Sequence, residues 1–149
     1  MQVIGVDGCK GGWVAVALED GVFAGATRYP DFRELVKAQP DALVIAVDIP
    51  IGLPEGASDH PRAGDLAARK LLGPRRSSVF LAPPRPVLAA DSYAAANDLH
   101  REITGAGLSA QAYALRKKIF EVDPLAARDP HTRPGEGGVQ TGVPSLELF

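Results

Sequence analysis

The chain has 149 residues, of which 46% are hydrophobic and 23% charged, and its formal net charge at pH 7 is -2. This size and composition suit one soluble globular domain with a sizeable core. The small net charge excludes a global electrostatic attraction to nucleic acid or membrane, and no apolar run approaches the ~20 residues of a membrane helix.

Cys9 is the only cysteine, which excludes an intrachain disulfide and a thiolate metal cluster. Such cysteine usage fits a reducing compartment. The first residues show no basic segment followed by an apolar run, so no secretory signal is expected. We therefore expect a cytoplasmic protein with no membrane partner.

The first thirty residues predict three antiparallel strands, at 2–7, 13–18 and 22–29. Glycine-rich turns separate them and permit positive φ. A short helix is expected to begin after Asp31, a good N-cap. Residues 42–48 predict a fourth strand without polar alternation, typical of a strand buried on both faces. The strand–helix–strand crossover predicts that this strand pairs parallel with the first.

The second half of the chain predicts helices and loops. We expect helices at 62–72, 92–103 and 109–122, with Ser109 as an N-cap, and a loop at 75–86. Gly73-Pro74 and Gly105 would end the first two helices. We interpret 1–126 as one domain and 127–149 as an irregular or disordered tail, whose last residues barely permit a strand.

Two aspartates, Asp7 and Asp48, each follow an apolar strand pattern and precede a turn. If the two strands are parallel neighbours, both carboxylates lie at one edge of the sheet, where open α/β sheets bind ligands. Carboxylate oxygens suit Mg²⁺ or Mn²⁺. Taken singly, either aspartate would more often cap a turn. Together they predict a shared metal site that activates water for phosphodiester hydrolysis.

The turn Asp7-Gly8-x-x-Gly11-Gly12 has a second interpretation, because its backbone N–H groups could hold a phosphate. Actin-like ATPases and sugar kinases use a similar loop, so a nucleotide-binding protein of actin-like fold is one alternative. A hairpin that simply needs glycine is the other.

The stretch 62–85 is basic, with six cationic side chains against one acid, Asp65. Arg69, Arg76, Ser77 and Ser78 are candidates for binding substrate phosphate. A solvated basic surface is the alternative, and Asp65 with Arg69 would then form an ion pair within the helix. Asp65 is also a possible additional acid for the metal site, and Glu121 could add a further carboxylate, or it could be solvated at a helix end.

Several segments together resemble the bacterial and archaeal family of domains of unknown function described as predicted RNase H-like nucleases. The resemblance covers residues 2 to about 125 and is carried by Val3-Ile4-Gly5-Val6-Asp7-Gly8-Cys9-Lys10-Gly11-Gly12-Trp13, Val47-Asp48-Ile49-Pro50-Ile51-Gly52-Leu53-Pro54, Asp65-Leu66-Ala67-Ala68-Arg69, Arg75-Arg76-Ser77-Ser78-Val79-Phe80 and Lys118-Ile119-Phe120-Glu121-Val122-Asp123.

The resemblance implies an α/β, RNase H-like three-layer fold, with three antiparallel strands, then a parallel strand, and helices on both faces. It also implies a divalent-metal-dependent nuclease with Mg²⁺ or Mn²⁺ on Asp7 and Asp48. Asp65, Arg69, Arg76, Ser77 and Ser78 match further polar positions of the family. The substrate class would be nucleic acid or another phosphoester.

The chain departs from the family pattern over Gly138-Val139-Gln140-Thr141-Gly142-Val143-Pro144-Ser145-Leu146-Glu147, where further acids and then a helix are expected. We therefore expect a domain that lacks the family's C-terminal part, and two carboxylates alone would hold a hydrated metal weakly. The remaining hypothesis is a non-catalytic module that binds nucleic acid or forms a homodimer through an unpaired sheet edge or an uncovered face.

Overall fold

The computed structural model describes residues 1–126 and 145–148. The chain divides into two compact units: unit 1 comprises Met1–Ile51 and Lys118–Phe149, and unit 2 comprises Gly52–Lys117. The sequence predicted a single domain over 1–126. The division arises because the segment after the fourth strand packs around an apolar cluster of its own, formed by Val87, Ala96, Leu108 and Tyr113.

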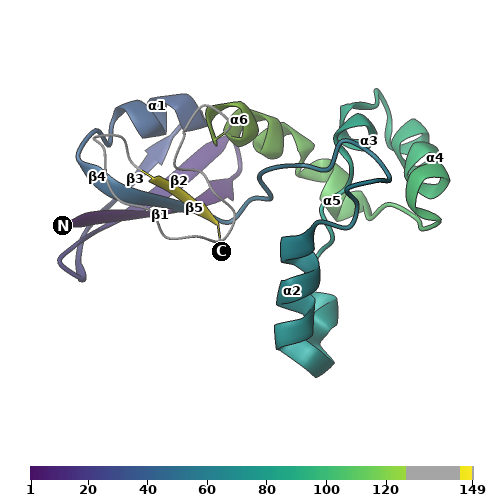
Figure 1. Cartoon of the computed structure of the whole chain (residues 1–149). Helices are drawn as coiled ribbons and strands as arrows, with labels where there is room; N and C mark the ends of the chain where they lie inside the picture. Colours follow the sequence, from purple (N-terminus) through teal and green to yellow (C-terminus); the bar gives the residue numbers. More distant parts are fainter. Residues whose placement is uncertain (127–144, 149) are drawn as a thin grey trace. The chain divides into compact units, whose positions relative to one another are not determined.

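Unit 1 is built on a five-stranded mixed sheet with the strand order β3-β2-β1-β4-β5 (Figure 1). The pairs β1–β2 and β2–β3 are antiparallel, whereas β1–β4 and β4–β5 are parallel. The strands are β1 (Gln2–Cys9), β2 (Gly12–Glu19), β3 (Val22–Tyr29), β4 (Ala42–Val47) and β5 (Ser145–Leu148). The predicted α/β class, with three antiparallel strands followed by a parallel one, is confirmed.

Strand β5 lies inside the segment that the sequence predicted as an irregular tail. Its residues pair with Val44–Val47, so the weak strand pattern at the end of the chain does form a strand. The remainder of that predicted tail, 127–144 and 149, lies outside the described residues.

Two helices, α1 (Phe32–Lys37) and α6 (Arg116–Ala126), lie on the same face of the sheet of unit 1 (Figure 1). The Trp13 ring packs edge-on against Phe32 with 5.0 Å between centroids. Its indole N–H donates to the Glu121 carboxylate of α6 at 2.7 Å. Lys118 Nζ lies 4.2 Å from the Trp13 ring centroid. One buried aromatic side chain therefore fastens both helices to β2.

The opposite face of this sheet, which we call the open face, carries Val3, Gly5 and Asp7 of β1. Ile4 and Val6, which alternate with them, are buried under the helices. Gly5 is exposed, and a Cβ added there would meet no atom within 4 Å. Within the described residues, both helices of unit 1 lie on the side of the sheet that carries Ile4 and Val6.

This arrangement corrects the expected burial of β4. Ile45 and Val47 are buried, but Val44 and Ala46 on the open face are only half-buried. The prediction that this strand is buried on both faces is wrong, because both helices of unit 1 lie on the Ile45 side. An uninterrupted apolar run indicates aliphatic side chains on both faces, but it does not show that both faces are covered.

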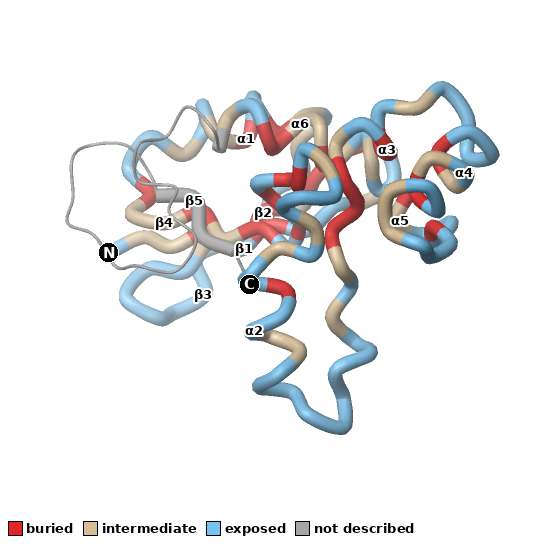
Figure 2. The backbone as a smooth tube through the Cα atoms, turned by 45° about the vertical axis from the view of Figure 1, so that its right-hand side comes forward, coloured by how far each residue is buried: buried red, intermediate tan, exposed pale blue. Residues whose placement is uncertain are grey.

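Unit 2 consists of short helical elements around its small apolar cluster. They are α2 (Ala63–Leu72), the 3₁₀ helix η1 (Gly73–Ser78), α3 (Arg85–Ala89), α4 (Tyr93–Thr104) and α5 (Ala110–Ala114). Figure 2 shows long exposed stretches over α2 and the segment that follows it. The loop predicted at 75–86 is partly helical, since η1 and α3 extend into it. Each of these two helices has a proline in its first two positions, where the fixed φ of proline favours a helix.

Local end signals were predicted well. The Asp31 side chain accepts a hydrogen bond from Glu34 N–H, and Gly105 ends α4 with a left-handed φ of 74°. Ser109 caps α5 as expected, but the single helix predicted over 109–122 is wrong. The structure breaks it at Leu115 into α5 and α6, because Tyr113 packs in unit 2 while Ile119 is buried in unit 1.

Candidate functional site

The parallel pairing of β1 with β4 brings Asp7 and Asp48 to adjacent positions. Val6 pairs with Val47, and Asp48 N–H donates to Val6 O at 3.4 Å, so the ladder continues to the aspartate. Adjacent residues in neighbouring strands lie about 5 Å apart. The expected placement of the two aspartates at one edge of the sheet is confirmed. Their predicted role in binding metal stays a prediction.

Both side chains are exposed, and neither has a hydrogen-bond or ion-pair partner among the described residues. Two carboxylates at neighbouring positions repel one another unless a cation lies between them. Over residues 1–126 and 145–148, no group of three or more His, Cys, Asp or Glu side chains that could hold a metal is found. The candidate centre is therefore a pair of carboxylates.

This donor set fits a hard divalent cation. Mg²⁺ prefers oxygen ligands and keeps several of its waters, so it is often held by only one or two carboxylates together with substrate oxygens. The pair suits Zn²⁺ poorly, since zinc sites in proteins usually combine nitrogen and sulfur ligands. Asp7 and Asp48 are thus the residues that would hold Mg²⁺ or Mn²⁺.

Glu121, the further acid proposed from the sequence, is engaged elsewhere. Its carboxylate accepts hydrogen bonds from Trp13 Nε1 at 2.7 Å and from Phe32 N–H at 3.3 Å. Both donors belong to the helix-covered side of the sheet, whereas Asp7 alternates onto the open face. Glu121 therefore joins α6, β2 and the start of α1.

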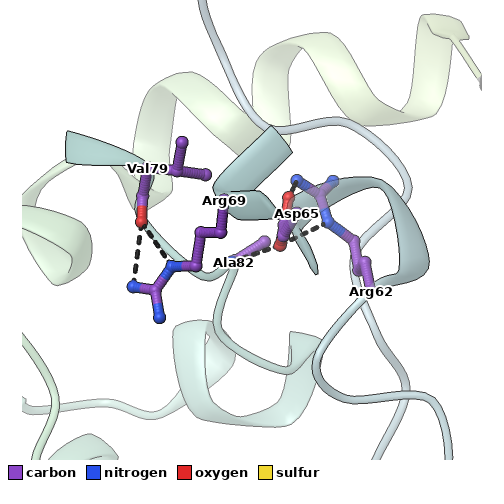
Figure 3. A network of polar contacts seen from close by, with 5 residues as sticks. All are labelled: Arg62, Asp65, Arg69, Val79 and Ala82. Carbon is purple, nitrogen blue, oxygen red and sulfur yellow. Dashed lines mark hydrogen bonds and ion pairs between the residues drawn. The ribbon is translucent and has the colours of Figure 1, made fainter. Parts of the chain in front are cut away.

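Two of the polar residues predicted over 62–85, Asp65 and Arg69, make hydrogen bonds within unit 2 (Figure 3). Asp65 is 7% exposed and binds Arg62 through two hydrogen bonds, at 3.0 Å and 2.5 Å. It also accepts a bond from Ala82 N–H at 3.0 Å. The Asp65–Arg69 ion pair considered from the sequence is wrong, because Asp65 pairs with Arg62 one turn earlier.

Arg69 instead donates from Nε and Nη2 to the carbonyl oxygen of Val79, at 3.0 Å and 2.9 Å (Figure 3). Two of its donors are thus used to hold the segment after η1. Arg76 and Ser77 are exposed and make no side-chain hydrogen bond within the described residues, while Ser78 Oγ donates to Arg75 O at 2.6 Å. Of the predicted phosphate-binding side chains, Arg76 and Ser77 are the two that make no side-chain hydrogen bond within the described residues.

Two histidines, His60 and His100, lie together in unit 2. The His60 and His100 rings are 6.0 Å apart in an edge-on arrangement. His60 Nε2 is buried without a partner among the described residues. Burial lowers the pKa of His60 from 6.5, and the nearby His100 lowers it further, while Asp65 and Asp59 act in the opposite direction. The structure therefore favours neutral His60.

Two basic residues, Lys10 and Arg28, lie at the same edge of the sheet as Asp7 and Asp48, and the sequence did not predict this. Lys10 and Arg28 line an open depression of about 600 Å³ together with Cys9, Gly11 and Val14. Only the strand register shows that Arg28, which is 21 residues beyond Asp7 in the chain, belongs with the first turn.

The comparisons with known proteins give one match. The family model described as "Protein of unknown function (DUF429)" matches residues 5–136. No curated protein and no solved structure matches the chain. In the part of the chain that the structure describes, no helix combines the length and apolar character that crossing a membrane requires.

Proposed function

This chain belongs to the DUF429 family, and from that premise we propose that unit 1 is the metal-binding core of a divalent-metal-dependent phosphodiester hydrolase. The observation that carries the proposal is the adjacency of Asp7 and Asp48 at the carboxyl ends of two parallel strands, with both carboxylates exposed and without a partner among residues 1–126 and 145–148. The RNase H-like resemblance of the sequence supports the same reaction class.

The residues would act as fixed oxygen donors. Asp7 lies within β1, where it pairs with Val14, and Asp48 directly follows β4 and donates its N–H to Val6 O, so the sheet positions the backbone of both residues. A divalent cation bound there would neutralise charge on a phosphodiester and lower the pKa of its bound water. Because Asp7 lies on the open face of unit 1, an extended substrate can approach along the neighbouring strands.

The first test is metal binding. We expect Mn²⁺ to bind in calorimetric titration, and we expect Asp7→Asn and Asp48→Asn each to weaken binding at least tenfold, since even changes around metal ligands cost about 10–100-fold. Asp41→Asn is the matched control, because Asp41 is an exposed aspartate just before the opposite end of β4. Equal Mn²⁺ affinity in all three variants would refute the site.

The second test is hydrolysis. Purified protein is incubated with Mn²⁺ or Mg²⁺ and single-stranded DNA, duplex DNA, single-stranded RNA and an RNA–DNA hybrid. We expect cleavage of at least one substrate, lost in Asp7→Asn and retained in Asp41→Asn. Metal binding without cleavage of any substrate would contradict the hydrolase and leave a metal-binding module.

Arg69, Arg76, Ser77 and Ser78 remain proposed phosphate contacts. Arg76 and Ser77 support that role best, because their exposed donors are not engaged within the described residues. Arg69 would act by holding Val79 and hence the end of η1. Arg76→Ala should weaken substrate binding while leaving Mn²⁺ affinity unchanged.

The second candidate function is a homodimerising module. It is favoured by edge strand β3, where Val22 is 70% and Phe23 65% exposed. An exposed apolar edge strand tends to pair with another chain. Light scattering should then show a dimer that Phe23→Lys converts to a monomer, whereas a monomeric wild-type protein would exclude this candidate.

A further inference from the structure

A row of residues crosses the sheet of unit 1 at the carboxylate edge. Arg28 of β3 pairs with Val14 of β2, and Val14 pairs with Asp7 of β1. Residues that pair directly across a sheet lie on the same face. Arg28, Val14 and Asp7 therefore share the open face, and Asp48 continues the row beyond β1.

The two ends of this row carry opposite charge. Asp7 and Asp48 form the acidic end, and the depression lined by Cys9, Lys10, Gly11, Val14 and Arg28 forms the basic end. Among the residues that the structure describes, neither Lys10 nor Arg28 has a carboxylate partner. Two exposed cations thus line one hollow, and no carboxylate of the described residues pairs with either of them.

A hydrogen bond to the backbone of the first turn positions the Arg28 side chain. Arg28 Nη2 donates to the carbonyl oxygen of Lys10, so the guanidinium is folded over the β1–β2 turn. Gly11 occupies this turn with φ of 73°, and a Cβ there would lie 3.4 Å from Arg28 Nη2. An arginine has five N–H donors, so most remain available after this bond, as do all three of the Lys10 ammonium.

We propose that Lys10 and Arg28 form a phosphate-binding subsite that holds a second phosphate of the substrate beside the Asp7–Asp48 pair. The inference deepens the proposed function and rests on it for the identity of the substrate as a phosphodiester. Asp7 and Arg28 are separated by two strand spacings, about 10 Å. A polymeric substrate can therefore place one phosphate at each end of the row.

The subsite chemistry is that of a phosphate anion, which either a nucleic acid or a small phosphoester could supply. The test uses the full chain in EDTA, so that binding is measured without metal. One arm follows a fluorescent single-stranded DNA oligonucleotide by anisotropy at several salt concentrations, and the other follows bis(p-nitrophenyl) phosphate. Both arms also record the alkylation rate of Cys9, the only cysteine, which lines the same depression.

We expect oligonucleotide binding that Lys10→Gln and Arg28→Gln each weaken roughly tenfold, the scale of one charge-assisted hydrogen bond. Each variant should reduce the salt slope by about 0.7, the value for one phosphate contact on a single strand. Arg33→Gln and Lys37→Gln are the matched controls, because both are exposed cations on α1, over the other face of the sheet. Bound phosphate should also slow Cys9 alkylation.

Several outcomes separate this inference from its alternatives. Binding of only the small diester, still weakened by Lys10→Gln, would keep the subsite and assign it to small phosphoesters. Unchanged affinity and salt slope in both variants, or no binding of either probe, would overturn it. If Arg28→Gln loses its fold because the bond to Lys10 O is structural, Lys10→Gln still decides, since the Lys10 ammonium has no partner within the described residues.

The same experiment distinguishes this inference from the proposed function. Asp7→Asn should lose Mn²⁺ binding and yet bind the oligonucleotide in EDTA as well as or better than wild type, because it removes a negative charge near the phosphate. Phosphate binding at Lys10 and Arg28 without any Mn²⁺ binding would refute the hydrolase and retain the subsite.

Discussion

Two glycines of the β1–β2 turn, Gly11 and Gly12, are required for different physical reasons. Gly11 needs its positive φ, whereas Gly12 needs to lack a side chain, because a Cβ there would lie 2.1 Å from the carbonyl oxygen of Tyr29. The obstacle is backbone, which cannot rotate away as a flexible side chain can. The glycine-rich pattern that suggested a phosphate loop is thus explained in part by the close approach of β3.

Gly12→Ala should therefore destabilise unit 1 by at least the ~1–3 kcal/mol typical of overpacking. Urea unfolding followed by Trp13 fluorescence measures the loss. Gly25→Ala is the control, because a Cβ at Gly25 meets nothing within 4 Å and alanine is favoured over glycine in a strand. A Gly12→Ala protein as stable as Gly25→Ala would contradict the close approach of β3.

The half-buried His60, whose Nε2 atom is buried, predicts a pH dependence in unit 2. Its folded pKa is lowered from 6.5, chiefly by burial and then by His100, so the folded state favours the neutral ring. A lowered folded pKa makes the folded state less stable at low pH, because the unfolded state binds the proton more tightly. The stability that neutral His60 contributes to unit 2 is therefore fully present above pH ~6.5 and is lost as the pH falls through the lower folded pKa. Asp65 and Asp59 oppose the shift and reduce its size.

We expect His60→Gln to be less sensitive than wild type to a change from pH 7.5 to pH 5. Hydrogen exchange of unit 2 amides at the two pH values, corrected for intrinsic exchange rates, measures the difference. Other carboxylates titrate in both proteins, so only the difference between them reports His60. Identical pH dependence would show that His60 is already hydrated and protonates freely.

At the level of elements, Asp65 joins α2 to the segment that returns past it. It accepts a hydrogen bond from Ala82 N–H and pairs with Arg62, which immediately precedes the helix. No side chain caps the N-terminus of α2, and the buried Asp65 carboxylate instead joins the first turn of this helix to Ala82 and Arg62. The four-residue spacing of Asp65 and Arg69 made an ion pair within the helix one alternative, because the sequence does not show that Ala82 N–H lies near Asp65.

Asp65→Ala should reduce the protection of α2 and Ala82 amides by an amount equivalent to about 1–3 kcal/mol, the cost of leaving a buried donor unsatisfied. Native-state hydrogen exchange of residues 63–82 measures it. Asp98→Ala is a suitable control, since Asp98 is 80% exposed and 3.9 Å from Arg101. If Asp65→Ala reduced the protection of these amides no more than Asp98→Ala does, other contacts would be holding α2.

The elements that could be predicted are those set by short-range chemistry. The hairpins, the cap at Asp31 and the stop at Gly105 depend on residues only a few positions apart, so the sequence indicates them directly. The break at Leu115 and the half-buried side of β4 depend on which unit or layer packs against them. That information resides in contacts between distant segments.

One part of the candidate site could be predicted from the sequence, and the other part depends on contacts between distant segments. Asp7 and Asp48 could be paired from sequence because a crossover connection enforces parallel strands, which places both strand ends at one edge. The register of β2 with β3 has no comparable rule, since the bulge between Ala17 and Leu18 shifts it. Arg28 and Lys10 could therefore be joined to the site only from the structure.

For the whole molecule, the division into two units makes ligand effects separable. Trp13, the only tryptophan, is buried in unit 1, and the proposed metal ligands lie in the same unit. A metal that binds only the folded state should stabilise unit 1 by about 2.7 kcal/mol at a concentration 100 times its Kd. Unit 2 has its own apolar cluster, so metal bound to unit 1 need not increase the stability of unit 2.

We therefore expect Mg²⁺ to shift the Trp13-monitored urea transition to higher urea, and Asp7→Asn to abolish the shift. Hydrogen exchange should show added protection in β1 and β4 and unchanged protection in α4. Because the apolar cluster of unit 2 is small, its amides should exchange through openings that leave the sheet of unit 1 intact. If protection rises equally in α4, the two units unfold as one cooperative structure, and metal bound at the edge of the sheet stabilises both.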